Sequence, residues 1–548
     1  MTELAIVNGI VFGAPGATTV AIEGGRITAV GGRETGAGAR ETVDARGGLV
    51  MPGFDDAHIH LLGGAREAGG ALLYPLETLE EVQAVIRAHA AAHPEHEWVL
   101  GRGWLYAAFP GGMPTAAQLD DVVPDRPAWI GCFDGHTSWA NTRAMELAGI
   151  TRETPDPPAG VIVRDAEGNA TGAFKEEAQA LIDRLVPKPT EREDREAVRR
   201  ALAGMHALGL TAAQDAWLEP DELAFWERVH ADGELALRFR GALIMTPDQS
   251  LAEWRDRLDA YEAQAFPLRG GDHLCSGILK GFVDGVVDSR TAALLAPYEG
   301  DTSTGLPAWE PRVLDAFVAE ADRRGWQVEL HAIGDRGVRL ALDAYEHAAR
   351  ANGPWAGDPH GRGTPPGTHR RRHRVEHVEM IDPADVPRFG ALGVIASMQP
   401  YHGDPTPSQI GPWAANIGPA RARSGWSWRS IREAGGVLAF GSDWPVVPYD
   451  PFIALNNAVN RTTTRGLPEG GWSDERLTLP QAIEAYTAGS AFAAYAEHRR
   501  GRVTPGLDAD VIVLHRDLLA AGPSAIIGTG VALTVLAGRI VHRSEALA

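Results

Sequence analysis

Cysteine is scarce in this sequence. Only Cys132 and Cys275 occur among 548 residues, too few for a disulfide framework or for a zinc site built from thiolates. Such low cysteine usage is typical of a reducing compartment. We therefore expect a cytoplasmic protein.

Basic residues are outnumbered by acidic ones. The chain has 51 Lys and Arg residues against 72 Asp and Glu residues, so its formal net charge is −21. This balance disfavours nucleic acids and anionic membranes as partners. We expect a small-molecule substrate, no nucleic acid and no membrane partner, and the sequence leaves open whether the chain forms a homo-oligomer.

A long hydrophobic run is also missing. The uncharged stretch 518–538 comes nearest, but Pro523, four glycines and the β-branched run VALTV divide it into turns and strands. The first residues, MTELAIVNGIVFG, lack the basic segment and long apolar core of a signal peptide. We expect no membrane anchor.

Both ends of the chain are rich in short β-strand patterns. Residues 1–50 contain AIVNGIVF and TVAIEGGRITAVGG, and residues 496–548 contain ADVIVLHRD and VALTVLAGRIVH. Because the two ends of a domain often lie close together, they are expected to form one small composite β-sandwich beside a central domain at 51–495.

The central domain repeats a strand-then-helix pattern eight times. The expected strands are 54–60, 210–216, 237–244, 277–283, 326–332, 372–377, 393–398 and 436–442. Eight such units predict an α/β fold of the (β/α)8 TIM-barrel type. The first two strands are separated by far more chain than a single crossover needs, so we expect an inserted subdomain at about 64–205.

Two histidines mark the end of the first expected barrel strand. His58 and His60, in GFDDAHIH, have the spacing that places both side chains on one face of a strand. One metal ion can be held by two such imidazoles. A single His-x-His is weak evidence, but this pair lies at the carboxyl end of its strand, where active sites of barrels are built.

Four other strands end in the same way. Each of these strands supplies one polar residue after a hydrophobic run: Lys280 in ILKGFVDG, His331 in VELHAIGD, His377 in HRVEHVEM and Asp443 in VLAFGSDWP. A polar group at the end of a buried strand is costly unless it is paired or bound to a metal. Five such strands in one barrel therefore indicate a shared polar centre.

The order of these motifs resembles the amidohydrolase superfamily. The series is PGF-x-D-x-H-x-H, then lysine with DG and SRTAAL downstream, then HAIGD, RVEH and GSDWPV. More narrowly, the chain is similar to the amidohydrolase-3 branch, which includes YtcJ-like hydrolases and N-substituted formamide deformylases. The resemblance covers nearly the whole chain and implies a TIM barrel with a composite β-sandwich.

The resemblance implies a set of metal ligands. His58 and His60 would bind one ion with Asp443, and His331 and His377 would bind a second. Lys280 would bridge them as a carbamate, which requires a neutral amine, and burial lowers a lysine pKa in that direction. The cofactor expected is zinc at two ions per chain, although these ligands also accept iron, manganese or cobalt.

The expected chemistry is hydrolysis of a carbon–nitrogen bond other than a peptide bond, in a small N-acyl or N-formyl amine. A metal lowers the pKa of bound water and polarises a carbonyl. Asp443 would be the catalytic residue, since a carboxylate beside metal and water can take a proton from the water and pass it to the leaving amine.

Five further residues are candidates for substrate binding. Trp104 and His136 lie in GRGW and FDGHTSWAN of the insert, which resemble segments that line the pocket in this family. Asp284 and Arg290 follow the Lys280 strand and either orient a ligand or form an ion pair with each other, which we favour. His402, in SMQPYH, follows the seventh expected strand, so it either faces the same mouth or belongs to a surface loop.

A second histidine cluster has the spacing of helical metal ligands. His89, His93 and His96 lie in VIRAHAAAHPEHE, but Pro94 interrupts the helix there and the segment is charged and alanine-rich. We expect no metal site at this cluster.

Two other functions compete with the amidase hypothesis. One is a mononuclear deaminase or cyclic-amide hydrolase on the same barrel, which Lys280 argues against. The other is a non-catalytic relative that binds a metal or ligand, which the complete set of expected ligands argues against.

Overall fold

The computed structural model describes residues 2–545 except 134, 136, 158–159 and 354–370. The chain forms two compact units, which are considered separately. Unit 1 comprises Met1–His60 and Leu202–Ala548, and unit 2 comprises Leu61–Ala201.

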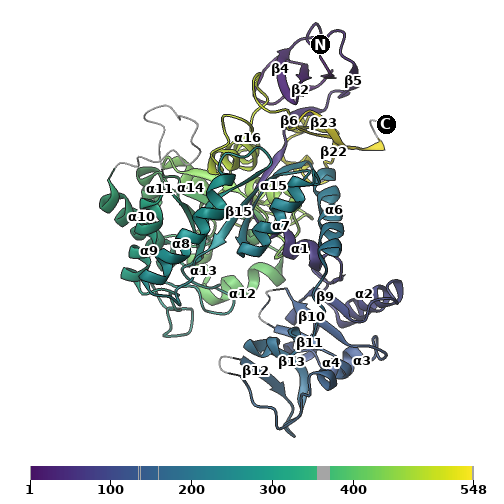
Figure 1. The fold of residues 1–548 in the computed structure, drawn as a ribbon, viewed down its shortest axis with the longest axis vertical. Coiled ribbons are helices and arrows are strands. Elements are labelled where there is room, and N and C mark those ends of the chain that lie inside the picture. The colour runs from purple at the N-terminus through teal and green to yellow at the C-terminus, as the bar shows by residue number, and fades with distance from the viewer. Residues whose placement is uncertain (1, 134, 136, 158–159, 354–370, 546–548) are drawn as a thin grey trace. The chain divides into compact units, whose positions relative to one another are not determined.

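Unit 1 contains a parallel barrel of eight strands (Figure 1). These are β7 (Phe54–Ile59), β14 (Leu210–Leu218), β15 (Arg238–Ile244), β16 (Leu274–Phe282), β17 (Gln327–Ala332), β18 (Arg374–His377), β19 (Ile395–Met398) and β20 (Val437–Phe440). Each strand pairs in parallel with the next along the chain. The expected α/β barrel is confirmed, and each strand overlaps its predicted range.

Helices lie between the strands, as parallel pairing requires. Those between successive barrel strands are α7 (Pro220–Ala231), α8 (Leu251–Ala265), α9 (Pro311–Arg323), α10 (Asp335–Asn352), α11 (Val386–Leu392), α12 (Pro407–Ile417), α13 (Pro419–Ala422) and α14 (Trp428–Glu433). After β20 come α15 (Pro451–Asn460), α16 (Leu479–Glu484), α17 (Ser490–Ala493) and α18 (Leu518–Ala521). Barrel strands are buried on both faces, which explains their continuous apolar runs.

The first and last barrel strands meet at their carboxyl ends. The backbone N–H of Asp443 donates to the carbonyl of His58 at 2.7 Å, and that of His60 donates to the carbonyl of Trp444 at 2.8 Å. Gly441 permits this approach, because a Cβ there would lie 2.4 Å from the backbone nitrogen of His58. The barrel is thus nearly closed at the end where its polar side chains collect.

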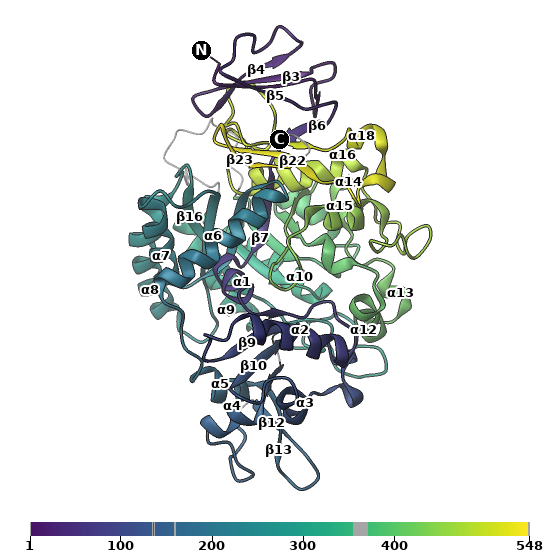
Figure 2. The same ribbon diagram turned by 90° about the vertical axis from the view of Figure 1, so that its right-hand side faces the viewer.

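Two sheets from the chain ends complete unit 1. One has the order β4 (Arg26–Gly31), β3 (Thr19–Glu23), β1 (Leu4–Val7), β5 (Glu41–Asp44); the other has the order β2 (Ile10–Val11), β6 (Leu49–Pro52), β21 (Val511–Leu514), β22 (Val531–Leu536), β23 (Arg539–Arg543). Figures 1 and 2 show the purple N-terminal strands beside the yellow β22 and β23. Ile6, Val20, Val511 and Val535 are fully buried in the hydrophobic cluster that both sheets share.

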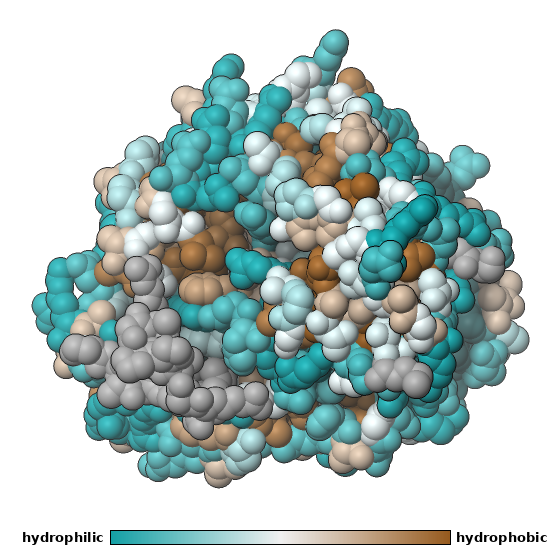
Figure 3. Space-filling view, turned by 90° about the horizontal axis from the view of Figure 1, so that it is seen from above, coloured by the Kyte–Doolittle hydropathy of each residue, from teal (hydrophilic) through white to brown (hydrophobic). Residues whose placement is uncertain are grey.

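Hydrophilic residues cover much of the face seen in Figure 3, with hydrophobic residues in patches between them.

Unit 2 is built around a six-stranded sheet in the order β12 (Gly160–Arg164), β13 (Ala170–Glu176), β11 (Thr137–Ala140), β10 (Ala128–Cys132), β9 (Val99–Trp104), β8 (Ala71–Leu72). Its helices are α1 (Leu61–Glu67), α2 (Leu79–Ala92), α3 (Ala116–Asp120), α4 (Thr142–Leu147) and α5 (Ala180–Asp183), and α6 (Glu191–Ala207) crosses the boundary between the units. The chain between β7 and β14 therefore forms a body with its own sheet, close to the expected 64–205.

Among the described residues, no helix combines the length and the apolar character needed to cross a membrane.

A buried ion pair joins the barrel to the C-terminal strands of unit 1. Arg238 on β15 donates from Nε and Nη2 to the carboxylate of Asp510 at 3.0 and 3.2 Å, and both side chains are at most 4% exposed. We expect Asp510→Asn to lower the free energy of unfolding by about 1.5–3 kcal/mol, the size of a hydrogen bond to a charged group. The loss should not be larger, because nearby Asp508 retains part of the attraction to Arg238. The urea unfolding midpoint would measure this loss.

The matched control is Glu41→Gln. Glu41 pairs with Arg543 between exposed side chains, and such pairs contribute about 1 kcal/mol or less. Equal effects of the two substitutions would contradict a special role for the buried pair.

Candidate metal centre

The end of β7 carries His58 and His60 into contact with Asp443. Asp443 Oδ1 lies 3.0 Å from His60 Nε2 and 3.4 Å from His58 Nε2. His58 is fully buried, whereas the His60 side chain is 27% exposed and borders the mouth. One carboxylate oxygen of Asp443, at the end of the barrel sequence, therefore lies beside two predicted histidine ligands from its beginning.

Four imidazole rings form a continuous series across the barrel mouth. The ring centroids of His60 and His58 lie 5.5 Å apart, those of His58 and His377 lie 5.0 Å apart, and those of His377 and His331 lie 4.4 Å apart. The tightest group within this series is His58, His377 and Asp443, whose ligand atoms all lie within 4.8 Å of one another. It combines members of the two ligand sets that the resemblance implied.

The donor chemistry fits a metal ion. Imidazole nitrogen and carboxylate oxygen suit zinc and other divalent first-row metals. His377 Nδ1 is buried with no hydrogen-bond partner in the described structure, which is costly for a polar atom unless it is coordinated. Burial also lowers the pKa of His377 well below its ordinary value, and the neutral imidazole is the form that binds metals.

Two of these ligands occupy strained backbone positions. His377 has φ 74° and Asp443 has φ 62°, in the left-handed region that residues with a Cβ rarely adopt. Each position costs about 1–3 kcal/mol and persists only where the surrounding structure imposes it. The two strands therefore turn sharply where their side chains meet the centre.

Lys280, on β16, lies beneath the histidines. Its Nζ is 3.4 Å from His58 Nε2, and the side chain is almost completely buried. Burial lowers the pKa of Lys280, an effect that Glu329, Glu376 and Asp443 partly offset. The Lys280 amine is therefore neutral in a larger fraction of molecules than the amine of a lysine exposed to water.

Burial acts differently on the other titratable groups. It lowers the pKa of His331 to about 3, with a further contribution from Lys280. Burial alone would raise the pKa of Asp443, but His58 and His60 hold it well below its usual range. Asp443 is therefore a carboxylate throughout the neutral pH range, and His331 is a neutral imidazole.

Glu376 is a buried carboxylate at the centre that the sequence analysis missed. Its Oε2 lies 2.5 Å from His58 Nδ1, and its other oxygen accepts a hydrogen bond from Arg374 Nε at 2.8 Å. A carboxylate on Nδ1 holds a histidine with Nε2 facing a metal. Asp443 and Glu376 also outweigh burial and Lys280 and raise the pKa of His58 to about 9. The RVEH motif contained Glu376, but nothing in its spacing pointed to His58.

Asp284 and Arg290 do not pair with each other, so the expected ion pair is wrong. Arg290 Nη1 lies 3.1 Å from Asp301, and its Nε donates to the side-chain oxygen of Asn416. Asp284 is buried and accepts three backbone N–H groups, from Ala293, Ile333 and Gly334. Burial raises the pKa of Asp284 to about 7 despite these bonds. Asp284 thus fixes the loop that follows His331.

The remaining substrate candidates separate into two groups. His402 reaches the centre, since its Nε2 is 3.6 Å from Asp443 Oδ2 and its ring stacks on His377 with an interplanar angle of 7°. Trp104 is fully buried within unit 2 and donates from Nε1 to the carbonyl of Ile130 at 3.0 Å, which makes it a packing residue. His136 lies outside the described residues.

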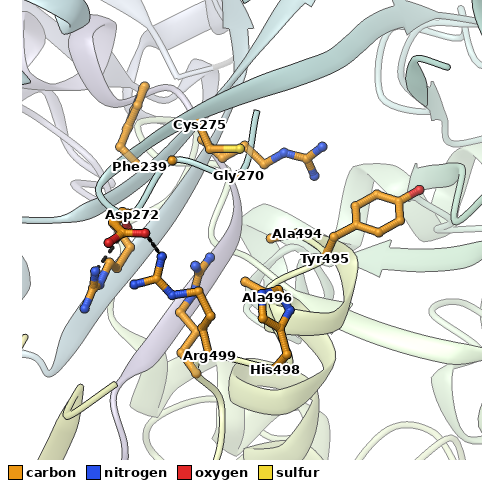
Figure 4. A pocket seen from close by; sticks show the side chains of 13 residues that line it. Phe239, Gly270, Asp272, Cys275, Ala494, Tyr495, Ala496, His498 and Arg499 are labelled. Atoms are coloured by element: carbon orange, nitrogen blue, oxygen red, sulfur yellow. Dashed lines mark hydrogen bonds and ion pairs between the residues drawn. The ribbon is translucent and has the colours of Figure 1, made fainter. Parts of the chain in front are cut away.

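A small cavity lies at the opposite, amino-terminal end of the barrel strands. Phe239 near the start of β15 and Cys275 near the start of β16 line it, and Figure 4 shows Asp272 and Arg499 pointing toward one another there. Its volume of about 30 Å³ is about the share of one water molecule in the liquid. It is too small for an organic substrate.

We expect Glu376→Gln to weaken metal binding by about 10–100-fold, the cost of losing a partner behind a metal ligand. Chelator competition on the purified protein would measure the change. Glu310→Gln, at the start of α9, is the control, because its side chain caps a helix and should leave metal affinity unaltered. An unchanged affinity in Glu376→Gln would show that His58 needs no orienting carboxylate.

Comparisons with known proteins agree with this geometry. Residues 41–542 match the model of the Amidohydrolase family. The chain is 30% identical to Protein LONG AFTER FAR-RED 3 of Arabidopsis thaliana, covering 94% of this chain and 87% of that protein. It is 29% identical to the putative amidohydrolase YtcJ of Bacillus subtilis, covering 92% and 90% of the two chains. It is 27% identical to N-substituted formamide deformylase of Arthrobacter pascens, covering 91% and 90%.

Among solved structures, the fold is similar to that of an uncharacterized metal-dependent hydrolase from Pyrococcus furiosus, with a TM-score of 0.71 and 24% identity over 95% of this chain and 99% of that chain. The family match at 41–542 includes the whole barrel and every predicted ligand. The resemblance inferred from the motifs is confirmed: the chain belongs to the amidohydrolase family and is a hydrolase of carbon–nitrogen bonds.

Proposed function

We propose that this protein hydrolyses the amide bond of a small N-acyl or N-formyl amine. The observation that carries the proposal is the meeting of His58, His377 and Asp443 at the barrel mouth, with Lys280 directly beneath. The similarity to N-substituted formamide deformylase supports the substrate class. The net charge of −21 supports a small substrate rather than a nucleic acid, and the two free cysteines support a cytoplasmic location.

The proposed cofactor is zinc, at two ions per chain. His58, His60 and Asp443 would hold one ion, His331 and His377 the other, and a carbamate on Lys280 would bridge them. When bound, zinc lowers the pKa of water and polarises a carbonyl. The neutral Lys280 amine that burial favours is the form that adds to carbon dioxide, losing one proton as the carbamate forms.

Asp443 is the proposed proton carrier. Its Oδ1 lies against His58 and His60, while its Oδ2 faces His402 at 3.6 Å. Because its low pKa keeps it ionised, Asp443 can accept a proton from the attacking water and return it to the leaving nitrogen. His402, which faces Oδ2 of Asp443, would orient the substrate carbonyl.

The first test is the metal content of the purified protein, measured by elemental analysis, followed by a screen of N-formyl and N-acyl amines. Two tightly bound zinc equivalents together with release of formate or a carboxylate would support the proposal. One equivalent would favour the mononuclear deaminase or cyclic-amide hydrolase, and no metal after reconstitution would favour a non-catalytic relative.

For Asp443→Asn, we expect the fold and much of the metal to remain while kcat falls by at least about 10²–10⁴-fold, the contribution of a positioned acid–base group. Steady-state kinetics with the best substrate of the screen would measure this. Asp259→Asn, on the exposed face of α8, is the matched control and should keep full activity. Near-normal turnover of Asp443→Asn would remove Asp443 from the mechanism.

For Lys280→Ala, we expect loss of the second metal ion and of most activity, with partial recovery when short carboxylates such as acetate are added. The added carboxylate can take the place of the missing carbamate. Elemental analysis and activity assays would measure both effects, with the exposed Lys188→Ala as the control. Metal content equal to that of the parent protein would argue against a bridging lysine.

A further inference from the structure

Four metal-binding side chains gather at the end of α2 in unit 2: His89, His93, Glu95 and His96. Helix α2 ends at Ala92, and the chain turns back so that the N–H of His96 donates to the carbonyl of His93 at 3.3 Å. The turn stacks the rings of His93 and His96, with centroids 4.8 Å apart and an interplanar angle of 7°. The proline that argued against a helical metal site thus lies in the turn that brings His96 beside His93.

The side chains have the separations of ligands around one ion. Glu95 Oε1 lies 3.3 Å from His93 Nδ1 and 3.6 Å from His96 Nε2, and one ligand atom from each residue lies within 4.8 Å of the others. With bonds of about 2.0–2.2 Å, a tetrahedral ion would separate its ligand atoms by about 3.3–3.6 Å. Both distances from Glu95 Oε1 already fall in this range, and to bind one ion the exposed, stacked rings of His93 and His96 would rotate so that their nitrogens point to a common position.

The backbone around this cluster is held in place by Arg126. Its guanidinium donates to the carbonyls of His93 and His96, each at 2.8 Å, and to that of Ala90. These bonds satisfy carbonyls that the helix end leaves without partners. They also fix the backbone of both histidines, so an ion would bind to ligands whose backbone is already ordered.

A fourth nitrogen stands one helical turn earlier. The His89 ring centroid is 4.7 Å from that of His93, the arrangement expected for residues four apart on a helix.

We propose that His93, Glu95 and His96 form an additional site for a divalent transition metal such as Zn²⁺, with His89 available as a fourth ligand. The residues of this site are distinct from those of the barrel centre. Two or three imidazoles and one carboxylate select zinc, nickel or copper over magnesium or calcium, which prefer oxygen ligands. The site is exposed, with side chains 41–64% accessible, so a bound ion would exchange with solvent more readily than one in the barrel.

The test is isothermal titration of the zinc-loaded full-length protein with additional Zn²⁺ alone. Because the barrel ligands are already occupied, the titration reports other sites. We expect one extra equivalent to bind to the parent protein. In His93→Ala/His96→Ala, the affinity for this extra zinc ion should fall by at least about 10–100-fold, the cost of losing a supporting residue at other metal sites. Hydrolytic activity should stay unchanged.

The matched control is His230→Ala/His347→Ala, which removes two exposed histidines elsewhere in the chain. This control should keep the extra equivalent. Circular dichroism of each variant would establish that the fold is retained. The proposal is overturned if the parent binds no extra zinc, if His93→Ala/His96→Ala binds it as tightly as the parent, or if the control loses it equally.

Discussion

The contact between the first and last barrel strands is the constraint on which the rest of the centre depends. Asp443 and His58, then His60 and Trp444, are joined through backbone hydrogen bonds, and Gly441 allows that approach. Only this closure places a carboxylate from the end of the barrel sequence against two histidines from its beginning. The left-handed backbone at Asp443 is tolerated because the surrounding bonds impose it.

Beneath that contact, the barrel interior balances buried charges. Arg374 binds Glu376 at 2.8 Å and Glu329 at 3.2 Å, and all three side chains are almost fully buried. A buried charge is strongly destabilising without a partner. Glu376 and Glu329 together neutralise Arg374, and Glu376 also accepts a hydrogen bond from His58. The same carboxylates lie close enough to limit the fall in the Lys280 pKa.

Much of this arrangement was predictable from strand endings. In a parallel barrel, the carboxyl ends of all strands face one side, so polar residues after apolar runs must converge there. The predictions for Asp284, Arg290 and Trp104 rested on weaker evidence. Trp104 is packed in the core of unit 2, Arg290 binds Asp301, and Asp284 accepts backbone N–H groups while its carboxylate lies 3.8 Å from His331. Motif similarity identifies a segment, but it does not determine whether one side chain within it faces a pocket or the core.

The sequence by itself determined the barrel and the polar side chains at its strand ends, because these follow from local periodicity and residue type, and it determined the family through the order of its motifs. Only the tertiary structure decided which groups become neighbours. His58 and Glu376 are 318 residues apart along the chain, and the turn after α2 brings the ring of His93 against that of His96, whereas Pro94 indicated only that the helix is interrupted. Such pairings depend on how strands close and turns fold back, and no local pattern encodes those distances.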